Sequence, residues 1–155
     1  MKSVHSQVSY LKSHSFKMKN VLVLCTGNSC RSQIADGYLK HFAGDKAAIY
    51  SAGIETHGVN PKAIKVMAED HINISNNTSN HVDEYIDIPF DFVITVCDNA
   101  NEACPFFPGD VKRFHHNFPD PAKAVGTEEE VFQEFVRVRD MIKVYSAEFV
   151  KQHIA

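Results

Sequence analysis

The 155-residue chain lacks the features that would tie it to a membrane or to nucleic acid. No apolar run approaches the ~20 residues that a membrane-spanning helix needs. Residues 1–17 also lack the continuous apolar stretch of a secretory signal. The formal net charge of −3 provides no basic surface for nucleic acid or anionic lipid. We therefore expect a cytoplasmic protein with no nucleic-acid partner and no membrane contact.

Cysteine is sparse, and the sequence argues against both a disulfide framework and a zinc site. The four cysteines are Cys25, Cys30, Cys97 and Cys104. Without an export signal the compartment is expected to be reducing, where retained thiols are buried apolar groups, metal ligands or redox groups. Neither cysteine pair has a partner at zinc-ligand spacing, and the nine histidines form no such set. We predict no bound metal and no resident cofactor.

The chain shows no internal repeat, low-complexity tract or linker. Its 44% hydrophobic and 23% charged residues are typical of a soluble globular protein, and its length fits one domain. We expect residues 1–17 to be a disordered N-terminal extension, with a short amphipathic turn as the alternative. Residues 18–155 are expected to form a single domain.

Short apolar runs alternate with stretches of helical periodicity. Strands are expected at 20–24, 47–52, 90–96 and 111–114, and helices at 32–42, 61–70, near 81–86 and from 128 onward. Asn60 before Pro61 predicts one helix start, and Thr127 with Glu130 forms a capping box for another. This alternation predicts an α/β three-layer sandwich, with a four-stranded parallel sheet covered on both faces.

Residues 25–32 read CTGNSCRS, a C-x5-R-S pattern between an expected strand and an expected helix. A strand-to-helix turn points backbone N–H groups inward beside a helix N-terminus, which suits a tetrahedral oxyanion. Arg31 offers a planar fork of donors to two oxygens of that anion. The same field favours the thiolate of Cys25, and Ser32 can donate to its sulfur. The predicted oxyanion-binding residues are Thr26, Gly27, Asn28, Ser29, Cys30, Arg31 and Ser32.

Gly27 and Cys30 have other expected roles in this loop. Gly27 is expected to adopt backbone angles that other residues avoid, and Cys30 is interpreted as a structural or spare thiol. A C-x5-R pattern also arises by chance, but the strand and helix around it favour a functional loop. A Walker-type nucleotide loop is excluded because no G-x4-G-K-[ST] sequence is present.

The loop resembles that of the low-molecular-weight protein tyrosine phosphatase superfamily. The resemblance implies that Cys25 is the nucleophile, that Arg31 binds the oxyanion, and that an aspartate before proline is the general acid. Asp120 in FPDPA matches this last element. A carboxyl group there could protonate a leaving oxygen, although Asp-Pro is also an ordinary turn pair.

The second cysteine pair lies in VCDNANEACP, with Cys97 at the end of an expected strand. Parallel sheets build their sites at the carboxyl ends of strands, so Cys25 and Cys97 should face the same edge. If residues 98–103 were helical, the two cysteines of the pair would lie about 10 Å apart along the axis. A disulfide needs Cα atoms within roughly 7 Å, so a Cys97–Cys104 bond would require this segment to unwind.

With this pair, the chain from Met18 to about Lys151 resembles the thioredoxin-coupled arsenate reductases, a branch of the same superfamily. The resemblance is carried, in order, by CTGNSCRSQ, SAG at 51–53, NPKAIKVM, ISNNTS, VCDNANEACP, FPDPA and FVRVRDMIK. Ala122 stands where phosphatases usually place an aromatic residue, and phosphatases lack the second cysteine pair. The resemblance therefore separates this chain from the hydrolytic branch.

The resemblance implies that the 18–155 domain is catalytic and reduces arsenate to arsenite. Cys25 would attack arsenate, Cys97 would release arsenite, and Cys104 would form a Cys97–Cys104 disulfide that thioredoxin reduces as the external reductant. The main alternative is a small phosphatase that hydrolyses phosphomonoesters through a Cys25 phosphocysteine. A non-catalytic redox-sensing or oxyanion-binding module is the third. Arsenate, phosphate and sulfate should all fit the loop.

Some arsenate reductases of this branch bind potassium beside the loop. The positions that match here are Asn28, Asp36, Ser51 and Asn80. Asn80 replaces the expected aspartate, and Asp36 is one methylene shorter than the usual glutamate. The sequence therefore indicates at most a weak potassium site.

Overall fold

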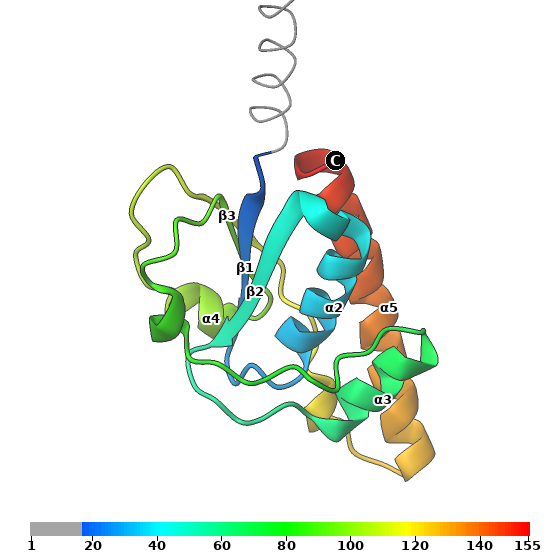
Figure 1. Cartoon of the computed structure of the whole chain (residues 1–155). Helices are drawn as coiled ribbons and strands as arrows, with labels where there is room; N and C mark the ends of the chain where they lie inside the picture. Colours follow the sequence, from blue (N-terminus) through cyan, green and yellow to red (C-terminus); the bar gives the residue numbers. More distant parts are fainter. Residues whose placement is uncertain (1–16) are drawn as a thin grey trace, which may run out of the picture.

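The computed structural model describes residues 17–155, so the expected extension at 1–17 lies almost entirely outside the described residues. Four parallel strands form one sheet in the order β2-β1-β3-β4 (Figure 1). Their bounds are β1 Lys19–Cys25, β2 Ala47–Gly53, β3 Phe92–Thr95 and β4 Lys112–His115. The expected four-stranded parallel sheet is confirmed.

Helices lie on both faces of this sheet. Figure 1 shows α2 (Arg31–Ala43) and α5 (Glu128–His153) on one side and the short α4 (Asp98–Glu102) on the other. The remaining α-helix, α3 (Pro61–Glu69), packs against α5 and α2 as an outer element. The 3-10 turns are η1 Gly44–Lys46, η2 Val82–Tyr85 and η3 Pro121–Lys123. The three-layer α/β arrangement agrees with the sequence prediction.

Two of the helix starts expected from the sequence have the predicted caps. The Asn60 side chain accepts a hydrogen bond from the Lys62 backbone N–H at 2.8 Å, directly before Pro61. The Thr127 hydroxyl accepts from the Glu130 N–H at 3.1 Å, while the Glu130 carboxylate accepts from the Thr127 N–H at 3.1 Å. These caps pair backbone groups that would otherwise lack partners at the helix ends.

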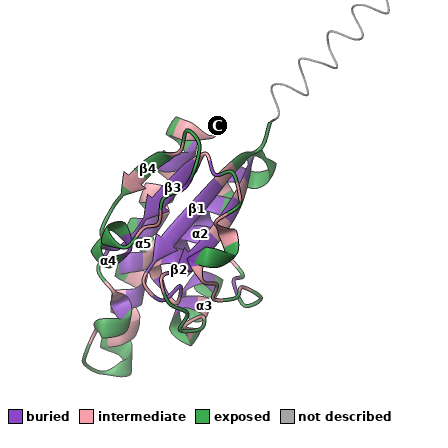
Figure 2. Ribbon diagram, turned by 90° about the vertical axis from the view of Figure 1, so that its left-hand side faces the viewer, coloured by how far each residue is buried: buried purple, intermediate pink, exposed green. Residues whose placement is uncertain are grey.

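Strand β1 lies in the middle of the core. Val21, Leu22, Val23 and Leu24 are all fully buried, and Figure 2 shows buried residues concentrated along the sheet and on the inner faces of α2 and α5. Burying one such side chain contributes roughly 1.5–3 kcal/mol. The strand is therefore a rigid support for Cys25 at its carboxyl end.

A cluster of hydrogen bonds joins α2, α5 and the end of α3 beside this core. Asp70, just after α3, accepts hydrogen bonds from the Tyr38 hydroxyl at 2.7 Å and from the Lys143 ammonium at 2.9 Å. The pKa of Asp70 is lowered below its ordinary value, mainly by the hydrogen bond from Lys143 and also by that from Tyr38.

Within residues 17–155, no helix is both long and apolar enough to span a membrane.

Candidate active site

The loop of residues 25–32, here called the oxyanion loop, joins the end of β1 to the start of α2. Cys25 is the last residue of β1 and Arg31 is the first of α2. The loop borders a cavity of about 260 Å³. Its lining residues are Cys25, Thr26, Gly27, Ser29, Cys30, Arg31, His57, Asp120, Ala122 and Lys123. The cavity is large enough for a tetrahedral oxyanion and places Cys25, Arg31 and Asp120 around it.

The buried Cys25 sulfur receives a hydrogen bond whose direction is set by a neighbouring amide. Ser32 Oγ lies 2.9 Å from Cys25 Sγ and 2.8 Å from the Asn28 amide nitrogen, which donates to it. Because the serine hydroxyl carries one hydrogen and accepts from Asn28, that hydrogen is left to donate to the sulfur. Asn28 Oδ1 in turn accepts from the Asn80 backbone N–H at 2.8 Å. Asn28 and Ser32 therefore support the loop from beneath, outside the cavity lining.

The reason given for Gly27 from the sequence is wrong. The positive φ in the loop belongs to Asn28, at 49°, and Gly27 is not among the glycines with positive φ. What requires glycine is space, because a Cβ at Gly27 would lie 2.3 Å from Nδ1 of His57. Gly53 is similarly confined, since a Cβ there would lie 2.7 Å from the Asn28 backbone nitrogen. Both glycines allow close packing around the loop.

Arg31 is held between the loop and the segment that carries Asp120. Its Nη1 donates to the Phe118 carbonyl at 3.0 Å, and its Nη2 lies 3.6 Å from Asp120 Oδ2. Asp120 also accepts from the Ala122 N–H at 3.0 Å, which fixes the start of η3. The carboxyl group therefore lies at the cavity, beside the guanidinium and within the same pocket as Cys25.

Cys30 is a poor candidate for a nucleophile. It is buried, and burial together with the nearby Asp120 carboxylate raises the pKa of its thiol to about 12. A neutral thiol contributes little to thiolate chemistry near neutral pH. This agrees with a structural role for Cys30 in the wall of the cavity.

Cys97 lies directly beside the oxyanion loop. Its sulfur is 3.3 Å from the Thr26 hydroxyl, and that hydroxyl accepts from the Asn99 amide at 3.1 Å. The hydroxyl hydrogen is therefore left to donate to the Cys97 sulfur, as in the Asn28–Ser32–Cys25 arrangement. The carboxyl ends of β1 and β3 thus bring the thiols of Cys25 and Cys97 to the same edge of the sheet.

Cys104 lies across α4 from Cys97. All four cysteines are free thiols, and Cys104 is the half-buried one. We call residues 97–104 the redox segment. Between its two cysteines only Ala100 is buried, while the other five residues are exposed. Because so little apolar surface holds α4 in place, its local unwinding should require little free energy.

Comparison with known proteins agrees with this geometry. Residues 20–154 match the model for low molecular weight phosphotyrosine protein phosphatases. The chain belongs to this family. It is 51% identical over 133 residues to the arsenate reductase of Bacillus subtilis (strain 168), across 86% of this chain and 96% of that protein. It is 53% identical over 124 residues to the arsenate reductase of Oceanobacillus iheyensis, across 80% and 89%.

Solved structures of the family share the fold. An arsenate reductase in the oxidized state superposes with a TM-score of 0.76 at 28% identity, across 87% of this chain and 98% of that one. Another, in the phosphate binding state, gives 0.72 at 29% identity, across 89% and 100%. Vibrio vulnificus Wzb in complex with benzylphosphonate, 19% identical, gives 0.73 across 88% and 99% and supports the fold alone.

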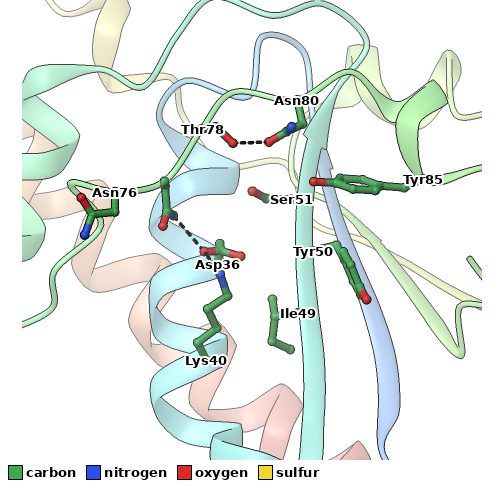
Figure 3. Close-up of a pocket in the computed structure, with 10 residues that line it drawn as sticks. Asp36, Lys40, Ile49, Tyr50, Ser51, Asn76, Thr78, Asn80 and Tyr85 are labelled. Carbon is green, nitrogen blue, oxygen red and sulfur yellow. Dashed lines mark hydrogen bonds and ion pairs between the residues drawn. The ribbon is translucent and has the colours of Figure 1, made fainter.

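Three of the four positions expected to bind potassium line a separate cavity of about 220 Å³ (Figure 3). Asp36, Ser51 and Asn80 line it, whereas Asn28 does not. The Asp36 carboxylate is paired with the Lys40 ammonium at 3.0 Å. Burial raises the pKa of Asp36, and the Lys40 charge opposes this. Because the Asp36 carboxylate is already paired with the Lys40 ammonium, these residues do not fit a bound potassium ion, and we assign no step to one.

Among the described residues, no group of three or more His, Cys, Asp or Glu could hold a metal ion.

Three polar residues near the site were not found from the sequence. His57 covers Gly27 and is held by Glu55 at 2.7 Å. Gln33 is fully buried and donates to the carbonyls of Asn28 and Thr78 at 3.1 and 3.0 Å. Arg113 on β4 contacts Cys104. His57 and Arg113 belong to no recognisable spacing pattern, and only the packing of distant segments brings them to the site. Gln33 directly follows Ser32 in the sequence, but its hydrogen bond to Thr78 joins it to a distant segment.

Proposed function

We propose that this protein is an arsenate reductase that uses Cys25, Cys97 and Cys104 in succession and is recycled by thioredoxin. The observation that carries the proposal is Cys97 beside the oxyanion loop, joined to it through the Thr26 hydroxyl. Hydrolysis of a phosphomonoester has no use for a second thiol at this position. The curated relatives named arsenate reductase support the same conclusion.

In the first step, the Cys25 thiolate attacks arsenate held by the loop N–H groups and Arg31. The hydroxyl of Ser32 stabilises the thiolate before attack, and the carboxyl group of Asp120 protonates the departing oxygen as water. Arg31 keeps two donors on the anion because its guanidinium is already oriented by Phe118 and Asp120. The product is an arsenic–sulfur adduct at Cys25.

Two thiol exchanges then complete the reduction. Cys97 attacks the Cys25 sulfur of the adduct, so a Cys25–Cys97 disulfide forms and arsenite leaves with the electron pair. Cys104 attacks Cys97, the Cys25 thiolate departs, and the redox segment unwinds to allow a Cys97–Cys104 disulfide. Thioredoxin reduces this bond. The electrons arrive through thiols, so no bound cofactor is required, and we place the protein in the reducing cytoplasm.

The related phosphatase reaction uses part of the same site. Arsenate and phosphate are both tetrahedral, and Cys25, Arg31 and Asp120 would serve either of them. We therefore expect weak hydrolysis of aryl phosphates as a side activity. Cys97 and Cys104 distinguish the two reactions, because hydrolysis would proceed without them.

The experiment measures NADPH oxidation with thioredoxin and thioredoxin reductase, with and without arsenate. We expect consumption that depends on arsenate and disappears in Cys97→Ser, while Cys97→Ser retains hydrolysis of an aryl phosphate. Cys104→Ser should complete one turnover and then stop. Absence of arsenate-dependent consumption in the parent protein, together with rapid aryl phosphate hydrolysis, would favour the phosphatase instead.

A further inference from the structure

The edge strand β4 contacts the redox segment with two alternate side chains. Arg113 reaches the end of the segment, and His115 reaches its beginning, where its Nε2 lies 2.7 Å from Asp98 Oδ1. Residues two apart on a strand share one face. Phe114 between them packs instead against Phe92 and Phe149 in the core. A rigidly anchored strand therefore presents two polar side chains to a weakly anchored helix.

Arg113 makes three contacts at the Cys104 end. Its Nη1 donates to Cys104 Sγ at 3.0 Å, and its Nη2 donates to the Pro105 carbonyl at 2.9 Å. The guanidinium also lies 5.9 Å from the ring centroid of Phe107, which is buried. The two donors hold the guanidinium in one orientation, with a full positive charge against the sulfur.

We propose that Arg113 is a specific activating residue of the relay, which keeps the Cys104 thiol available as a thiolate for attack on Cys97. The inference rests on the proposed function, because that function gives Cys104 its task. Burial raises the pKa of the Cys104 thiol above its ordinary value, and the charge and hydrogen bond of Arg113 limit that rise without reversing it. Among the described residues, Arg113 is the group whose charge and hydrogen bond to the sulfur favour the thiolate of Cys104.

The charge moves in a balanced way during this step. The Cys104 thiolate attacks the Cys97 sulfur of the Cys25–Cys97 disulfide, so the 97–104 bond forms as the 25–97 bond breaks. The electron pair leaves with Cys25, and no external oxidant or reductant is needed. Negative charge therefore passes from Cys104, beside the guanidinium of Arg113, to Cys25, beside the hydroxyl of Ser32. In this exchange the attacking thiolate of Cys104 has Arg113 as its partner, and the departing thiolate of Cys25 has Ser32.

The test measures the pH dependence of Cys104 alkylation by iodoacetamide, followed by mass spectrometry of the peptide that contains it. Arg113→Met removes the charge and keeps most of the packing, Arg113→Lys restores a charge, and Asp98→Asn loosens the other end of the segment. We expect Arg113→Met to shift the alkylation midpoint to higher pH and to slow alkylation at pH 7 by about fivefold or more. Arg113→Lys should recover part of this loss, and Asp98→Asn should leave the midpoint unchanged.

A second readout follows the exchange itself in a single turnover with arsenate and no thioredoxin. Arg113→Met should form the Cys97–Cys104 disulfide more slowly at pH 7, with a difference that narrows as the pH rises. An unchanged midpoint in Arg113→Met, or an equal shift in Asp98→Asn, would overturn the proposal. So would a shifted midpoint without slower exchange. Alkylation needs no arsenate, so a failure of the proposed function would appear separately, as a parent protein that forms no disulfide with arsenate.

Discussion

Asn28→Asp should strongly reduce the activity of the protein while leaving its fold largely intact. The aspartate would retain the acceptor for the Asn80 backbone N–H, and Asp tolerates positive φ nearly as well as Asn. Its second oxygen, however, would face the Ser32 hydroxyl, where the amide of Asn28 now donates at 2.8 Å. The single serine hydrogen would turn to the carboxylate and would no longer donate to the Cys25 sulfur. The substitution therefore reverses one hydrogen bond beneath the nucleophile.

The size of the effect follows from the bond that is lost. A hydrogen bond to a charged group contributes about 1.5–3 kcal/mol, and each 1.36 kcal/mol changes a rate tenfold. Loss of the Ser32 donation, at a sulfur–oxygen distance of 2.9 Å, should lower kcat/KM by about 10-fold to 100-fold. The added carboxylate charge acts in the same direction, because it repels both the thiolate and the anionic substrate.

The assay compares kcat/KM for arsenate and for an aryl phosphate with the thermal midpoint of each variant. Asn28→Gly is the matched control, because it accepts the φ of 49° and leaves the serine hydrogen free. It also removes the acceptor of the half-buried Asn80 N–H, which should destabilise the protein by about 1 kcal/mol. Asn28→Gly should therefore lose more stability and less activity than Asn28→Asp. Equal activity in Asn28→Asp and the parent would refute the assigned direction of the hydrogen bonds.

Three further predictions concern other parts of the molecule. Thr26→Val removes the hydroxyl that donates to Cys97, and it should slow release of arsenite by about tenfold in a single-turnover assay, with less effect on aryl phosphate hydrolysis. The thermal midpoint should be the same in KCl and NaCl, because the Lys40 ammonium already neutralises Asp36; a higher midpoint in KCl would indicate a potassium site. Because the pKa of Asp70 is lowered in the folded state, its carboxylate stabilises the protein at neutral pH, and this stability is lost as the pH falls below the ordinary value of 3.8. The difference in thermal midpoint between the parent and Asp70→Asn should accordingly shrink towards acid pH.

The fold was predictable because its signals are local. The first three strands are short apolar runs, and the caps at Asn60 and Thr127 depend on residues within three positions. The parallel orientation of the strands followed from their alternation with helices. The neighbouring positions of Cys25 and Cys97 followed in turn, because the carboxyl ends of β1 and β3 share an edge of the sheet.

The parts of the site that escaped prediction depend on contacts between distant segments. Gly27 was identified as special, but its constraint comes from His57, thirty residues further along the chain, and not from its own backbone angles. Lys40 neutralises Asp36 one helical turn away, a pairing that sequence alone does not distinguish from a solvated lysine. Arg113 meets Cys104 only because β4 and the redox segment lie side by side. The spacing of residues in the sequence does not predict such contacts between distant segments.

In the relay that we propose, Cys104 has a different kind of donor from Cys25 and Cys97, for a physical reason. Cys25 at the end of β1 and Cys97 just after β3 are buried, so a neutral hydroxyl at 2.9 Å or 3.3 Å can keep its geometry there. Cys104 is half-buried on a segment that must move. A hydrogen bond weakens steeply when its atoms shift by an ångström, whereas the attraction between unit charges falls only as the inverse of distance. A guanidinium on the fixed strand β4 therefore continues to stabilise the thiolate after the segment begins to unwind, which a hydroxyl at the same place would not do.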